Sequence, residues 1–209
     1  MQTDDVKTTI VLVRHGETAL NVAGHFRGRA DPPLTERGIE QARAVAQALV
    51  SWRPLAVFAS PRLRAQQTAA AIGARVQRTP ELEPRLDDID HGSWTGLSRS
   101  EVASRWPEDH RRWLEAPEGV TLPNGESASD VVARMASLLD DVRSRAAGGT
   151  TVLVTHDVAI RLALCHVLGA PLAAMHRIHT GLTSMTVLVT EGSSMVVDRV
   201  NDGGHLETI

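Results

Sequence analysis

The sequence predicts an α/β fold, a three-layer α/β/α sandwich around a mainly parallel sheet. Strand-like and helix-like segments alternate along the chain, as they do where helices connect parallel strands. Two continuous apolar, β-branched runs, residues 9–13 and 150–155, have the composition of strands buried on both faces. The length of 209 residues and the hydrophobic content of 42% suit one domain with a substantial core.

The first part of the chain contains clear signals for the starts of helices. Thr35 suits the N-cap of a helix, and Ser60-Pro61 separates an apolar strand from the helix that follows it. The expected elements are strand 9–13, helix 35–49, strand 55–59, helix 62–72 and a short strand at 75–77.

In the second part, Ser127 and Asp130 form a capping-box pattern that opens a long helix, and Gly148-Gly149 interrupts it. The expected elements are helices 99–105, 108–114 and 127–145, strand 150–155, helix 157–168, and a hairpin of strands 183–190 and 195–200.

The segment 80–123 is unlike the rest, because it is rich in Pro, Gly, Trp and charge. It is expected to be a helical insertion on the scaffold, either over the active site as a wall of the substrate pocket or as a passive surface excursion. The whole chain, residues 1–209, is expected to form a single domain.

The net charge of −3 argues against a nucleic-acid partner. Cys165 is the single cysteine of the sequence, so an internal disulfide is excluded and a reducing compartment fits. The N-terminal residues lack a signal-peptide pattern, and no apolar run has the length of a membrane span. A cytoplasmic location without a membrane partner is therefore expected.

Residues suited to chemistry follow three predicted strands. The first strand ends in Arg14 and His15, His156 follows the strand at 150–155, and Arg64 lies just beyond the second strand. Because ligands bind at the carboxyl edge of such sheets, these residues are expected to meet there. A histidine beside a cation suits a nucleophile for a phosphate ester, whereas a lone strand-end histidine is more often structural.

Further motifs occur in a fixed order over nearly the whole chain. They are Arg14-His15-Gly16-Glu17-Thr18 with Asn21, Leu34-Thr35-Glu36-Arg37-Gly38 with Gln41-Ala42, Ser60 to Thr68, Gly92-Ser93-Trp94-Thr95-Gly96, Pro123-Asn124-Gly125-Glu126-Ser127, and Val154-Thr155-His156. Together they resemble the signature of the histidine phosphatase superfamily, in its phosphoglycerate mutase-like branch.

The resemblance implies that His15 is a nucleophile that becomes phosphohistidine, held with its substrate by cationic and polar neighbours. The implied catalytic residues are His15, Asp88, Arg14, Arg64 and His156, and the implied substrate-binding groups are Asn21 and the backbone around Gly28. Arg27 precedes Gly28 in the same loop and is a further substrate-binding candidate. Arg27 is expected either to donate to the phosphate or substrate, or to face solvent.

The resemblance also implies an acidic side chain that protonates the leaving oxygen, and here the sequence departs from the usual family pattern. Asp88 aligns where the family usually has glutamate, and its side chain reaches ~1.5 Å less far. Asp88 is favoured, with Asp90 and Asp87 as competitors. These carboxylates with His91 lack the spacing of an ion-binding loop, so no metal is expected.

Asp157 stands where many relatives have glycine. It is expected to cap the following helix rather than point into the pocket, where it would disfavour an anionic substrate. His176 and His179 have helical spacing and are expected to be solvated or to cap a helix, with a pocket wall as the second interpretation.

The expected activity is metal-independent hydrolysis of a small phosphorylated metabolite through a phosphohistidine. Phosphoglycerate mutase-type transfer and a non-catalytic phospholigand-binding domain are the alternatives. No cofactor is expected, because nucleotide-binding glycine motifs are absent from the sequence. The resemblance also suggests a homodimer.

Overall fold

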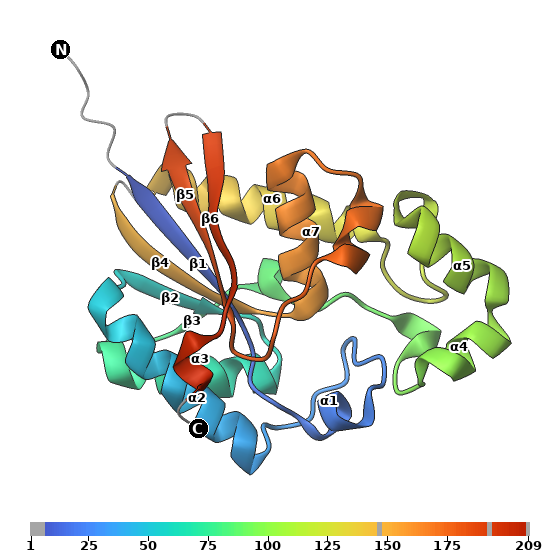
Figure 1. Cartoon of the computed structure of the whole chain (residues 1–209), viewed down its shortest axis with the longest axis horizontal. Helices are drawn as coiled ribbons and strands as arrows, with labels where there is room; N and C mark the ends of the chain where they lie inside the picture. Colours follow the sequence, from blue (N-terminus) through green and yellow to red (C-terminus); the bar gives the residue numbers. More distant parts are fainter. Residues whose placement is uncertain (1–6, 146–147, 192–193, 208–209) are drawn as a thin grey trace.

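The computed structural model describes residues 7–145, 148–191 and 194–207. In these residues one sheet of six strands has the order β3-β2-β4-β1-β5-β6. Strands β1 to β4 are mutually parallel, and β5 and β6 complete one side as an antiparallel hairpin (Figure 1). The strands are β1 (Thr8–Arg14), β2 (Ala56–Ala59), β3 (Glu81–Leu82), β4 (Gly149–Thr155), β5 (Met185–Glu191) and β6 (Ser194–Asp202).

Helices connect the parallel strands and cover the sheet. They are α1 (Ala19–Ala23), α2 (Glu36–Ala48), α3 (Leu63–Val76), α4 (Arg99–Arg105), α5 (Pro107–Glu115), α6 (Ala128–Arg145) and α7 (Asp157–Leu168). Short 3-10 turns occupy Leu49–Trp52, Pro84–Leu86, Gly92–Trp94, Pro117–Gly119, Leu172–Arg177 and Gly204–Leu206. Within the described residues, no helix has both the length and the apolar character needed to cross a bilayer.

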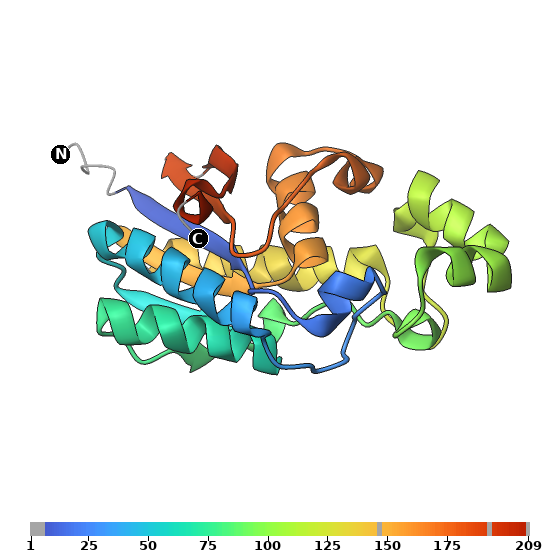
Figure 2. The same ribbon diagram turned by 60° about the horizontal axis from the view of Figure 1, so that its bottom comes forward.

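The sheet separates two hydrophobic cores, as the alternation of side chains along a strand requires. Val11 and Val13 of β1 pack in the core with α2 and α3, and Ile10 and Leu12 pack in the core with α6 and α7. Figure 2 shows α2 and α3 together on one side of the sheet. The predicted three-layer α/β/α class is therefore confirmed.

The insertion is not a passive excursion. Its helices α4 and α5 stand beyond one end of the sheet (Figure 1), and its aromatic residues join the core beside α6 and α7. Trp94 is fully buried and meets Trp113 edge to face at 6.4 Å between ring centroids. The segment is thus anchored well enough to form a defined wall.

Most element predictions are correct to within a few residues, but the strand at 75–77 is wrong. Helix α3 continues to Val76, and Gln77 ends it in the left-handed conformation at φ 57°. The strand that pairs with β2 is Glu81–Leu82. These two residues are both exposed at the sheet edge, so they carry no hydrophobic pattern that a sequence could reveal.

Candidate active site

The carboxyl ends of three neighbouring strands meet at one point. His15 follows β1, His156 follows β4, and Ser60 follows β2, and all three are fully buried. The two imidazole rings lie 5.2 Å apart between centroids, and Nε2 of His156 is 2.8 Å from Oγ of Ser60. The predicted convergence of strand ends is therefore present.

His15 is held in one tautomer. Its Nδ1 lies 2.7 Å from the carbonyl oxygen of Gly16, which can only accept, so Nδ1 carries the hydrogen. Nε2 then has a free lone pair, and it has no hydrogen-bond partner among the described residues. Burial, followed by the charges of Arg64 and Arg14, holds the pKa of His15 well below its ordinary value. The ring is neutral at physiological pH, with one nitrogen free to attack.

Arg64 is fully buried beside the two histidines. It donates from Nη1 to the carbonyl of Ala30 at 2.6 Å, and from Nη2 to the carbonyl of Gly28 at 3.1 Å. Nη2 also contacts Oδ2 of Asp88 at 2.9 Å. Burial lowers the pKa of Arg64, and Asp88 opposes that shift. Gly28 thus contributes a carbonyl that orients Arg64; at its φ of +47°, an added Cβ would lie 2.9 Å from the backbone nitrogen of His91.

The structure separates the three candidate carboxylates. Oδ2 of Asp88 lies 3.7 Å from Nδ1 of His156, so this residue completes a buried cluster of His15, Arg64, Asp88 and His156. Asp87 instead receives two hydrogen bonds from Arg62, at 2.7 and 2.8 Å.

Asp90 accepts from the backbone nitrogen of Gly92 at 2.9 Å and pairs with Arg29 at 3.3 Å. The three carboxylates therefore face different partners. Among residues 7–145, 148–191 and 194–207, no group of three or more His, Cys, Asp or Glu is arranged to hold a metal ion.

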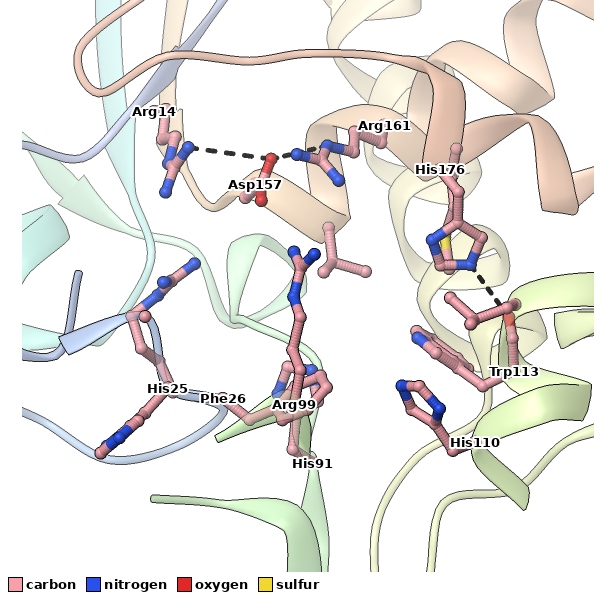
Figure 3. A pocket seen from close by; sticks show the side chains of 15 residues that line it. Arg14, His25, Phe26, His91, Arg99, His110, Trp113, Asp157, Arg161 and His176 are labelled. Carbon is pink, nitrogen blue, oxygen red and sulfur yellow. Dashed lines mark hydrogen bonds and ion pairs between the residues drawn. The ribbon is translucent and has the colours of Figure 1, made fainter. Parts of the chain in front are cut away.

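Asp157 does not cap α7, contrary to expectation. The helix begins after His156 without a side-chain cap, and the Asp157 carboxylate turns to two arginines instead (Figure 3). Its Oδ1 lies 2.7 Å from Nε of Arg161 and 3.9 Å from Nη1 of Arg14, and it accepts from Oγ1 of Thr180 at 2.5 Å. Charge-assisted contacts outweigh the weaker gain from a cap.

Arg14 is nearly buried and donates from Nη1 to the carbonyl of Thr180 at 2.5 Å. Burial lowers its pKa to about 10, while Asp157 opposes the shift and Arg27 adds to it.

Arg27 is half-buried, and its Nε has no partner among the described residues. Its charge also contributes to the lowered pKa of His15, and its side chain lines the cavity beside the cluster.

Asn21 lies outside the buried cluster's hydrogen bonds. Its Oδ1 accepts from the backbone nitrogen of Thr18 at 3.0 Å and from the Thr18 hydroxyl at 2.7 Å, which forms the capping box of α1. The amide oxygen is therefore committed to the loop that follows His15.

A cavity of about 480 Å³ lies beside the cluster, with Arg14 and Arg27 on its wall. The insertion, α7 and the segment after α7 supply its other walls (Figure 3), formed by Arg99, His110, Trp113, Arg161, Met175 and His176. Nε2 of His176 lies 2.9 Å from the Trp113 carbonyl. His176 is exposed and also lines the cavity, so it is both solvated and a pocket wall, and His179 is exposed as the favoured interpretation expects.

Several cavity residues escaped sequence reasoning. The spacing of Asp157 and Arg161, four residues apart on a helix, is a signal that could have revealed their ion pair. Arg99 and Trp113 carry no such signal, because the packing of the insertion decides where they point.

An unprotonated imidazole nitrogen beside guanidinium groups is suited to accept a phosphoryl group. The fold and the site together define an α/β protein with a histidine-and-arginine phosphoryl site at the carboxyl edge of its sheet.

Known proteins share this design. The model of the histidine phosphatase superfamily (branch 1) matches residues 10–203. Phosphoserine phosphatase 1 of Hydrogenobacter thermophilus is 36% identical over 197 residues, 94% of this chain and 93% of that protein. A probable phosphoglycerate mutase GpmB of Yersinia pestis is 32% identical over 206 residues, 95% of this chain and 94% of that protein.

A crystal structure of a mutant phosphoserine phosphatase from Entamoeba histolytica with phosphoserine has a TM-score of 0.88 at 27% identity, covering 95% of this chain and 99% of that one. The chain belongs to the histidine phosphatase superfamily, as its motifs predicted.

Proposed function

We propose that this protein is a phosphomonoester hydrolase that acts on a small phosphorylated metabolite through a phosphohistidine at His15. One observation carries the proposal: the Gly16 carbonyl fixes the hydrogen on Nδ1, so Nε2 is an unprotonated nucleophile beside Arg64 and Arg14. The phosphatases among the relatives support the same reaction class.

In the first step, the Nε2 lone pair of His15 forms a bond to phosphorus while the ester P–O bond breaks. The leaving oxygen takes the bonding electrons and receives a proton from Asp88. Arg14, Arg64 and His156 stabilise charge on the phosphoryl oxygens, where electrostatic stabilisation lowers the barrier most. These guanidinium groups supply the charge that a metal would provide elsewhere, so we propose a metal-independent reaction.

In the second step, water attacks phosphorus and the P–N bond breaks, which returns the electron pair to Nε2. Asp88 takes a proton from this water and is ready for the next cycle. The contact of Asp88 with Arg64 and its 3.7 Å separation from His156 support it over Asp87, which Arg62 holds.

Substrate must reach a nucleophile that is 0% exposed. Arg14 directly precedes His15 in the chain, and both Arg14 and Arg27 line the cavity beside it. We propose that these two side chains shift to grip the incoming phosphate and uncover Nε2.

Hydrolysis and mutase-type transfer share the first step and differ in what accepts the phosphoryl group. Purified protein should release free phosphate from p-nitrophenyl phosphate and from metabolite esters, with an acid-labile phosphoryl label on the protein. His15→Ala should lose both signals, whereas His179→Ala, an exposed histidine, should keep them. Activity should persist in EDTA.

Rapid isomerisation of phosphoglycerates with a bisphosphate primer and little free phosphate would favour the mutase. Absence of both label and turnover would favour a binding domain.

The cytoplasmic location and the homodimer are also proposals. The buried, unpaired thiol of Cys165 supports a reducing compartment. Light scattering coupled to size-exclusion chromatography tests the homodimer.

A further inference from the structure

The walls around the candidate site carry more positive charge than a phosphate needs. Among the described residues, five arginines and two acidic residues line the cavity or belong to the buried cluster, a formal excess of four positive charges when Asp88 holds the proton that it donates in the first step. They are Arg14, Arg27, Arg64, Arg99 and Arg161, with Asp88 and Asp157. Burial lowers the pKa of His91 to about 4 and also lowers that of His176, so these rings add no charge at neutral pH. A phosphomonoester dianion leaves two of these positive charges without a counterion.

Arg99 reaches the cavity from the insertion rather than from a strand end. It is the first residue of α4, and its side chain extends into the middle of the cavity (Figure 3). It makes no ion pair or hydrogen bond with the part of the chain that the structure describes. The charge of Arg99 lowers the pKa of His176 on the cavity wall, whereas the charge of Arg27 lowers the pKa of His15. Arg99 is therefore free for a group of the substrate other than the phosphate.

Arg161 provides a second set of donors toward the same space. Its Nε forms an ion pair with Asp157, 2.7 Å from Oδ1. Its two Nη groups form no hydrogen bond or ion pair with described residues. Asp157 keeps this guanidinium in place on the cavity wall. Planar guanidinium groups bind a carboxylate through two parallel hydrogen bonds, which favours this anion at such a position.

Resting on the phosphatase function proposed above, we propose that Arg99 and Arg161 form a carboxylate subsite, so that the preferred substrate is a small phosphorylated carboxylic acid. A carboxylate pairs with part of this excess, whereas a second phosphate would bring a larger negative charge against Asp157 beside Arg161. The cavity of about 480 Å³ has the size of small-molecule sites.

Four phosphate esters test the proposal in pairs. Phosphoserine and 3-phosphoglycerate carry a carboxylate; phosphoethanolamine and glycerol 3-phosphate are their counterparts without one. Wild-type kcat/KM should be about tenfold or more higher for the carboxylate member of each pair, the size of a charge-assisted hydrogen bond. Arg99→Gln should collapse this ratio. Arg105→Gln is the matched control, because Arg105 lies on the same helix, is exposed and pairs with Glu101, and it should leave the ratio unchanged.

Equal kcat/KM within each pair, or an unchanged ratio in Arg99→Gln, would overturn the carboxylate subsite while leaving the phosphatase intact. Failure to release phosphate from any ester, p-nitrophenyl phosphate included, would instead refute the proposed function itself.

Discussion

Replacing Gly38 with alanine should damage the site from the far side of the nucleophile loop. Gly38 lies in the first turn of α2, against the backbone that follows His15, and a Cβ there would lie 2.2 Å from the Glu17 carbonyl oxygen. The approach is equally close from the other side, because a Cβ added at Gly16 would lie 2.5 Å from the Gly38 carbonyl oxygen. Non-bonded heavy atoms need about 3.5 Å, so the loop must move by about 1 Å.

That shift reaches the nucleophile directly, because the Gly16 carbonyl orients the His15 ring at 2.7 Å. A misplacement of about 1 Å costs about 100-fold in rate, and overpacking costs about 1–3 kcal/mol of unfolding free energy. The assays are kcat/KM with p-nitrophenyl phosphate and urea unfolding. Gly119→Ala is the control, since its nearest contact is a side-chain nitrogen at an ordinary 3.5 Å. Wild-type kcat/KM in a folded Gly38→Ala protein would refute the reasoning.

Two further predictions concern Asp88 and His91. Asp88→Asn should lower kcat by about 100-fold or more, with an initial burst of p-nitrophenolate because breakdown of phosphohistidine loses its base. Asp87→Asn weakens the contacts of Asp87 with Arg62, Ser60 and the Asp88 backbone nitrogen but keeps the Asp88 carboxylate, so it should lower kcat less, and the reverse order would contradict the assignment. The pKa of His91 is about 4 in the folded protein, so the unfolded chain binds a proton first as pH falls below 6.5. The free energy of unfolding should therefore drop by about 3 kcal/mol between pH 6.5 and 4 through this residue. Urea unfolding of His91→Gln over the same pH range should show a smaller drop. An identical pH dependence in the variant would count against this role of His91.

The fold was largely predictable because its strong signals are local. The apolar runs that became β1 and β4 are buried on both faces, and Thr35 and Ser127 cap the helices they were expected to cap. The edge strand β3 failed for the opposite reason, since two exposed residues acquire strand structure only by pairing with β2. Tertiary context alone creates that element.

The site divides in the same way. The positions of His15 and His156 at the ends of buried strands predicted that they would meet. The family motifs predicted that Arg64 and Asp88 would join them. The orientation of Asp157 was mispredicted although its helical spacing from Arg161 was readable, because its other partner, Arg14, comes from β1 and only the folded chain brings that residue to α7.

The central position of β1 has an evolutionary consequence. This strand, like its neighbour β4, is paired on both sides and packed into both cores, so the proposed nucleophile at its end is attached to a tightly held backbone. Arg99, by contrast, projects from a seven-residue helix at the periphery. New substrate preferences can therefore arise by exchanging side chains on α4 and α5, while the bond-breaking apparatus is inherited unchanged.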